Sequence, residues 1–277
     1  MPVTIPTALI EMHLVPWLLV LFRLSGVFLL SPILGSGTIP RYVKALLVFI
    51  LSLCVYPVLL ADPGSAAFAH ASAMMGQSLG LWQLLPVAAL ELLLGYIVGY
   101  TASLPLIGMQ VGGNIIDQQL GLAFAQIVNP ELGESSSVIA EFLFMTALAL
   151  FVIVGGHYAM LAVLIGSFSH VPLGGFHDIS GLVAMTVGLL GVMFELAIKV
   201  SAPVLCLMFL QSVAMGFIAR TVPQMNILSV GFSIRILAGS VMLITSIGVI
   251  TMLYRDSLLE TMDALMHFMS PPSGPES

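Results

Sequence analysis

The polar residues best suited to form a site are concentrated in one run, Gly112 to Ser136, of a chain that is otherwise strongly apolar. The run reads GGNIIDQQLGLAFAQIVNPELGESS. The carboxamides of the run and the Asp117 carboxylate can form hydrogen bonds with protein or water; these residues are Asn114, Asp117, Gln118, Gln119, Gln126 and Asn129. The middle of the run is strongly apolar, which would be costly on an open surface. We expect irregular backbone from Gly112 to Glu134, folded into a cavity. An ordinary solvent loop is the alternative.

Catalytic and metal-binding chemistry has little support in the sequence. The six histidines are dispersed, without HExxH or similar spacing, and two cysteines cannot build a zinc site. GGNIID is neither a Walker A motif nor GxGxxG. We therefore predict a non-enzyme without a metal or cofactor. Cys54 and Cys206 lie in apolar runs, where a buried, inert thiol is expected.

Several charges fall inside long apolar segments, where each costs at least a few kcal/mol unless it faces protein or water. They are Arg23, Glu91, Glu141, Glu195 and Lys199. Glu195 and Lys199 stand four residues apart with the acid first, the favourable order for a helical ion pair. Mutual neutralisation inside a bundle is one interpretation. Contact with neighbouring subunits, or with a hydrophilic pore, is the other.

The elements that must position these residues are apolar helices. The chain has 277 residues, 59% hydrophobic and 7% charged, the composition of a membrane protein. We predict an all-α, multi-helix integral membrane protein, with helices broken at Pro86, Pro105, Pro172 and Pro203. A net charge of −6 leaves no basic surface for nucleic acid. The expected spans are Leu14 to Leu34, Val43 to Ala61, Leu81 to Met109, Val138 to Val154, Gly181 to Leu210 and Ile236 to Leu253.

The few basic residues suggest an orientation. Arg41 and Lys44 fall in the first connection, which is expected to be cytoplasmic and so places the N-terminus outside. No cleavable signal peptide is evident, so we expect the N-terminus to be retained. Residues 266–277 are expected to form a disordered tail.

Small residues recur at helical spacing. Gly95 with Gly99, and Gly108 with Gly112, form two GxxxG pairs that allow helix backbones to approach closely. Together with the scattered charges they favour a packed subunit of an assembly.

Three stretches together resemble one protein family. FRLSGVFLLSPILGSGTIPRYVK, GGNIIDQQLGLAFAQIVNP and ARTVPQMNILSVGF are similar to the FliR family of type III secretion export gates, flagellar and injectisome. The resemblance runs from about Leu14 to Leu265. It implies packed helical hairpins, with a FliP-like N-terminal part over residues 1–185, including a plug loop at 110–130, and a FliQ-like helical hairpin over residues 186–265.

The resemblance also implies roles for particular residues. Gly112 and Gly113 would bend the plug loop, while Asn114, Asp117, Gln118 and Gln119 would hold it by polar bonds. Leu120, Leu122 and Phe124 would seal the channel, with Met109 at the entrance. The family view pairs Arg23, Glu91, Glu195 and Lys199 between helices or subunits. The cytoplasmic hairpin tip would include Arg220, Pro223, Gln224 and Asn226.

As for partners, the resemblance implies a helical hetero-oligomer with FliP and FliQ, and FlhB at its cytoplasmic entrance. Unfolded flagellar proteins would cross it, and the place would be the bacterial inner membrane at the flagellar basal body. No nucleic acid and no cofactor would take part, and lipid would surround the chain. A small secondary transporter and an assembly scaffold that does not line the pore are the alternatives.

Overall fold

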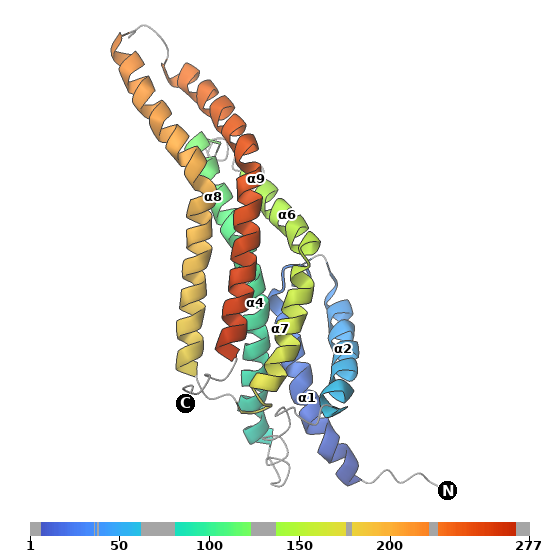
Figure 1. The fold of residues 1–277 in the computed structure, drawn as a ribbon. Helices are drawn as coiled ribbons and strands as arrows, with labels where there is room; N and C mark the ends of the chain where they lie inside the picture. Colours follow the sequence, from blue (N-terminus) through green and yellow to red (C-terminus); the bar gives the residue numbers. More distant parts are fainter. Residues whose placement is uncertain are drawn as a thin grey trace. The chain divides into compact units, whose positions relative to one another are not determined.

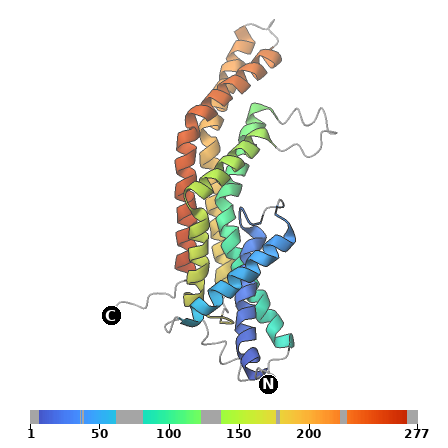
Figure 2. The same ribbon diagram turned by 90° about the vertical axis from the view of Figure 1, so that its right-hand side faces the viewer.

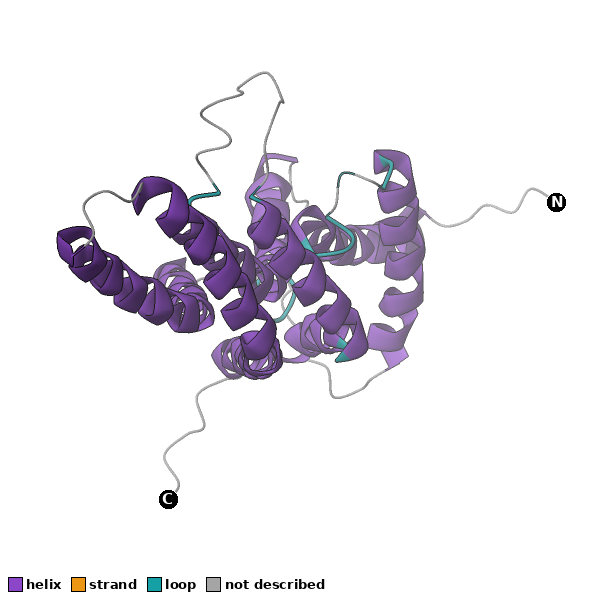
Figure 3. Cartoon of the chain, turned by 90° about the horizontal axis from the view of Figure 1, so that it is seen from above, coloured by secondary structure: helices purple, strands orange, loops and turns teal. Residues whose placement is uncertain are grey.

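A computed structural model describes residues 7–35, 37, 39–61, 81–122, 137–175, 179–221 and 227–269. Its elements are α-helices, and the described residues contain no strand (Figure 1, Figure 3). The all-α prediction is therefore confirmed. The helices are α1 (Thr7–Leu30), α2 (Arg41–Ala61), α4 (Leu81–Leu120), α6 (Val138–Ile153), α7 (Gly156–His170), α8 (Ile179–Thr221) and α9 (Ile227–Met269).

Five of these helices, α1, α2, α4, α8 and α9, are long and apolar enough to cross a membrane. The pair α6 and α7, interrupted at Val154 and Gly155, would add a sixth crossing if counted as one broken span. The prediction of a multi-helix membrane protein is confirmed. α8 and α9 have 43 residues each, or about 65 Å at the helical rise per residue. A hydrocarbon core is only about 30 Å thick, so hydropathy alone does not place these helices in the bilayer.

Three of the four expected proline breaks are wrong. Pro86 and Pro105 lie inside α4, and Pro203 lies inside α8. A proline removes one hydrogen bond from a helix, but membrane helices tolerate this because neighbouring groups satisfy the freed carbonyl. Pro172 does lie at a break, between α7 and α8.

The irregular backbone expected from Gly112 onward is also wrong as far as Leu120, because α4 continues to that residue. Gly112 and Gly113 lie against neighbouring helices, and such tertiary contact outweighs the weak helical propensity of glycine. The helix is followed by Gly121, whose φ of 80° suits a residue without a side chain. Residues 123–136, including Phe124, lie outside the described residues.

The chain divides into two compact units, each assembled from separated stretches. Unit 1 consists of residues 1–103, 155–189 and 260–277, and unit 2 of residues 104–154 and 190–259. α1, α2 and α7 belong to unit 1, α6 belongs to unit 2, and α4, α8 and α9 contribute to both. The division expected at residues 185 and 186 concerns resemblance to other proteins and stays a prediction.

In unit 1, α1 packs against α2 and α4. The Trp17 and Phe49 rings meet edge to face, with centres 5.6 Å apart, and His13 Nδ1 lies 2.8 Å from the Tyr56 hydroxyl oxygen. The buried apolar residues of this unit include Leu19, Val20, Leu24, Val27, Phe28, Leu94, Ile97, Val98, Phe168 and Leu173.

In unit 2, α8 and α9 lie side by side over much of their length (Figure 1, Figure 2). Gln211 Nε2 donates to the Gly231 carbonyl oxygen at 3.2 Å, and Arg235 Nη2 donates to Ser212 Oγ at 3.1 Å. These bonds join the two helices. The buried apolar residues of this unit include Leu104, Met109, Ile116, Leu120, Leu143, Phe151, Val200, Val204, Met208 and Ile250.

The outward faces of these helices are strongly apolar. Phe209 is 72% exposed in the single chain, and Ile244 is 70% exposed. The prediction that Cys54 and Cys206 are buried is wrong, because both are exposed. In a membrane protein an apolar segment is apolar on its outside as well, so hydropathy alone cannot tell a core position from a lipid-facing or partner-facing one.

Candidate functional site

The charges predicted to lie inside apolar segments form two very different pairs. Arg23 on α1 and Glu91 on α4 form a buried ion pair with Nε and Oε2 2.5 Å apart, and their side chains are 0% and 1% exposed. Lys199 and Glu195 pair on α8 at 2.6 Å, but their side chains are 53% and 62% exposed. The first pair joins two helices inside unit 1. The second remains on one helix face, open to solvent, lipid or a partner.

The Arg23–Glu91 pair also holds α7 and the turn that follows it. Arg23 Nη1 donates to Ser167 Oγ at 3.3 Å and to the Val171 carbonyl oxygen at 3.1 Å. The guanidinium carbon lies 4.5 Å from the centre of the Phe168 ring, a cation–π contact. Glu91 Oε1 accepts from the Gly174 backbone N–H at 2.9 Å. The pair therefore ties α1, α4, α7 and one turn together.

α1 and α4 approach so closely here that their contact excludes side chains. A Cβ built on Gly95 would lie 1.8 Å from the Arg23 carbonyl oxygen. One on Gly26 would lie 2.2 Å from the Leu92 carbonyl oxygen, and one on Gly99 2.6 Å from that of Val27. The first GxxxG pair thus marks a helix crossing.

The second GxxxG pair serves another crossing, within unit 2. Cβ atoms built on Gly108 and Gly112 would each lie 3.0 Å from an α8 carbonyl oxygen, those of Met193 and Ala197. One on Gly113 would lie 2.4 Å from the Cα of Ala140 on α6. The glycines expected to bend a loop instead give α4 close contacts with two helices.

Asp117 lies one helical turn beyond Gly113 and is 3% exposed. Its Oδ2 accepts from the backbone N–H groups of Ile139 and Ala140, at 3.0 and 3.4 Å. These are among the free N–H groups at the start of α6, which a negative charge stabilises. Asp117 therefore caps a helix that begins about twenty residues after it in the chain.

The other residues of the expected plug divide into buried and exposed groups. Met109 and Leu120 are 0% exposed. Asn114, Gln118 and Gln119 are exposed on α4, and Leu122 is half-buried in the turn after it. Leu120 packs into a space left by Gly239 on α9, where a Cβ would lie 2.1 Å from Leu120 Cδ2. The structure brings Asp117 and Leu120 into the packing of unit 2, and Phe124 lies outside the described residues.

Replacing Leu120 with Ala tests whether this side chain belongs to the core of unit 2. We expect a loss of about 2–5 kcal/mol of stability, because a fully buried leucine leaves a cavity. Thermal unfolding of the purified chain in detergent would measure it. The control is Gln119→Ala, an exposed neighbour on the same helix, which should change the unfolding temperature little. Equal effects of the two substitutions would contradict the core assignment.

The expected hairpin tip is described only at its edge. Arg220 is exposed in the last turn of α8, which ends at Thr221. Pro223, Gln224 and Asn226 lie outside the described residues. The role of the tip stays a prediction.

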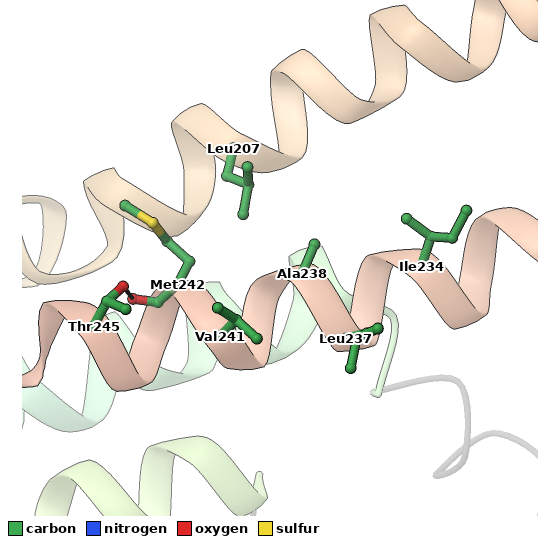
Figure 4. Close-up of a pocket in the computed structure, with 7 residues that line it drawn as sticks. All are labelled: Leu207, Ile234, Leu237, Ala238, Val241, Met242 and Thr245. Atoms are coloured by element: carbon green, nitrogen blue, oxygen red, sulfur yellow. Dashed lines mark hydrogen bonds between the residues drawn. The ribbon is translucent and has the colours of Figure 1, made fainter.

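An apolar groove lies between α8 and α9 in unit 2 (Figure 4), with a volume of about 410 Å³. The Thr245 hydroxyl donates to the Met242 carbonyl oxygen of its own helix at 2.9 Å, so it offers little to a ligand. The groove therefore suits an apolar occupant. Its lining residues are Leu207, Ile234, Leu237, Ala238, Val241, Met242 and Thr245.

Among the residues described, no group of three or more His, Cys, Asp or Glu side chains is arranged to hold a metal ion. The arrangement described above is one of packing and capping rather than of reacting groups.

Comparison with known proteins identifies the family. The family described as bacterial export proteins, family 1, matches residues 14–261. The chain belongs to this family. It is 27% identical over 260 residues to the flagellar biosynthetic protein FliR of Bacillus subtilis (strain 168), covering 92% of this chain and 94% of that protein. It is also 27% identical over 221 residues to FliR of Escherichia coli (strain K12), covering 79% of each.

A relative with a different name also matches most of the chain. The surface presentation of antigens protein SpaR of Shigella sonnei is 27% identical over 216 residues, covering 78% of each chain. The resemblance inferred from three short stretches is confirmed. The chain is a membrane-embedded bacterial export protein, and the match spans residues of both units.

Sequence reasoning missed several partners of the predicted residues in this export protein. Ser167, Phe168, Val171 and Gly174 surround the Arg23–Glu91 pair. The one sequence signal for them was the break predicted near Pro172. A turn at such a break has backbone N–H groups outside the helix, and these can donate to a carboxylate. Ser137 was also missed, although a serine directly before an apolar run is a recognisable start of a helix.

Proposed function

We propose that the chain is a non-enzymatic subunit of the flagellar type III protein export gate. With FliP and FliQ it forms a channel for unfolded flagellar proteins in the bacterial inner membrane. The supporting observation is the family match over residues 14–261. The matches to proteins named flagellar biosynthetic protein FliR in Bacillus subtilis and Escherichia coli support the flagellar system.

The proposed closing mechanism is steric. The chain from Leu122 to Ser137 includes Phe124 and other apolar side chains, and it acts as the plug of the closed channel. The end of α4 supports the plug, since Gly112 and Gly113 pack against other helices and Leu120 is buried. Asn114, Gln118 and Gln119 form an exposed polar face of α4 at the base of the plug.

The apolar outward faces of α8 and α9 support the proposed assembly. Large apolar side chains such as Phe209, Phe217 and Leu237 are more than two-thirds exposed in the single chain. We propose that FliP and FliQ cover part of these faces and that lipid covers the rest. FlhB would meet the assembly near Arg220, at the exposed end of α8.

The decisive experiment replaces residues 123–136 with a Gly/Ser linker of equal length and leaves α4 and α6 intact. Deleting residues from Gly113 onward would also destroy the α4 contacts, so it would not isolate the plug. We expect increased ion leakage across the membrane while FliP and FliQ still copurify with the chain. Leakage, motility and copurification would be measured together in cells.

The matched control replaces residues 270–277 with the same kind of linker and should leave leakage unchanged. A tight membrane around an assembled complex would contradict the plug and favour a scaffold that does not line the pore. A small secondary transporter would instead bind its coupling ion as the purified chain alone, which titration calorimetry would detect.

A further inference from the structure

We propose that Asp117 is a positioning residue, a detachable clasp that holds the start of α6 against α4 while α6 keeps a cap of its own. The two ends of the segment 123–136 are joined to these two helices. The clasp therefore determines how far apart the segment begins and ends. An effect of this spacing on closure of the channel rests on the function proposed above.

The clasp is formed by one carboxylate oxygen. Asp117 Oδ2 accepts from the N–H groups of Ile139 and Ala140, which lie in the first turn of α6. Asp117 Oδ1 is buried and has no hydrogen-bond partner within the described part of the chain. The carboxylate thus faces the positive end of a helix and has few competing bonds.

α6 has a second, local cap. Ser137 Oγ accepts from the same Ala140 N–H at 3.3 Å, the usual bond of a serine N-cap. When Asp117 leaves, Ser137 still satisfies Ala140, and only the Ile139 N–H loses its acceptor. The start of α6 therefore remains helical with the clasp open.

The packing beside the clasp is also suited to separation. Gly113, one turn before Asp117, places its bare backbone against Ala140. Neither residue has a side chain beyond Cβ, so no long side chain interlocks at this point. A polar bond over such a contact can open without displacing a long side chain at this point.

The test measures the distance between α4 and α6 in the full-length chain in lipid nanodiscs. Spin labels at Asn114→Cys and Phe142→Cys, both exposed positions, report it by pulsed electron resonance after Cys54 and Cys206 are replaced with Ala. We expect Asp117→Ala to broaden the distance distribution at least twofold. Asp117→Asn should keep it narrow, because its amide oxygen still accepts. Ser137→Ala should also keep it narrow, because Asp117 remains.

Hydrogen exchange of the unmodified chain gives a second reading that does not depend on a variant folding. The Ile139 amide should exchange faster than that of Ala140, because clasp opening exposes Ile139 alone. A narrow distribution in Asp117→Ala, a broad one in Asp117→Asn, or equal exchange of the two amides would overturn the clasp. Broadened distances with unchanged ion leakage in cells would keep the clasp and count against the proposed plug.

Discussion

Replacing Glu91 with Ala should strongly destabilise unit 1. The substitution leaves the Arg23 guanidinium, which is 0% exposed, without its counter-charge, and the Gly174 N–H without its acceptor. Breaking one partner of a buried ion pair costs about 3–5 kcal/mol. Whole domains are stable by only about 5–15 kcal/mol. The amount of chain in membranes and its unfolding temperature in detergent would measure the loss.

The same chain contains the control. Glu195→Ala breaks an ion pair of similar length, but on the exposed face of α8. An exposed pair four residues apart contributes about 0.3–0.5 kcal/mol, so this variant should resemble the parent. Glu91→Gln keeps an acceptor for Gly174 and should fall between the two. If Glu91→Ala were as stable as Glu195→Ala, the buried pair would not be a support of unit 1.

Replacing Gly95 with Ala should also lower the stability of unit 1 strongly. The added methyl group would lie 1.8 Å from the Arg23 carbonyl oxygen, and this backbone atom cannot move without moving α1. α1 and α4 must therefore separate. Overpacking a core costs about 1–3 kcal/mol and sometimes more. The shift would also strain the Arg23–Glu91 bond, so we expect a lower unfolding temperature and less chain in the membrane.

Gly188→Ala is the matched control, because a Cβ on Gly188 in α8 meets nothing within 4 Å in the single chain. Removing glycine from a helix interior stabilises it by about 0.5–1 kcal/mol. In the isolated chain, the same Gly→Ala substitution should therefore lower the stability at position 95 and raise it at position 188. A stabilising Gly95→Ala would mean that the α1–α4 crossing is not a close backbone contact.

Some features of the site could be predicted from sequence because they depend on local spacing. Glu195 and Lys199 pair because four residues bring two side chains to one helix face. Gly95 and Gly99 lie together on a helix face for the same reason. The partners of Arg23 could not be found this way. Glu91, Ser167 and Gly174 come from elements far apart in the chain, and one sequence carries no signal of their meeting.

The backbone of the polar run was predicted wrongly as far as Leu120. Gly112, Gly113 and Asp117 have the composition of a loop, and sequence reasoning assigned them to one. In the structure the glycines let α4 pass close to α6 and α8, and the aspartate caps α6. Intrinsic propensity is a weak preference, and packing against two helices outweighs it.

The prediction of Cys54 and Cys206 as buried failed because hydropathy does not distinguish an inner from an outer apolar face.

The sequence by itself determined that this is an all-α membrane protein of the bacterial export family. Apolar content and characteristic short stretches are properties of the chain before it folds. Only the tertiary structure decided which charges are buried, which glycines form helix crossings, and that Asp117 reaches the start of α6. Those properties arise when distant segments of the chain meet. The dehydration of a charge and the close fit of two helix backbones both depend on which residues of another segment face them.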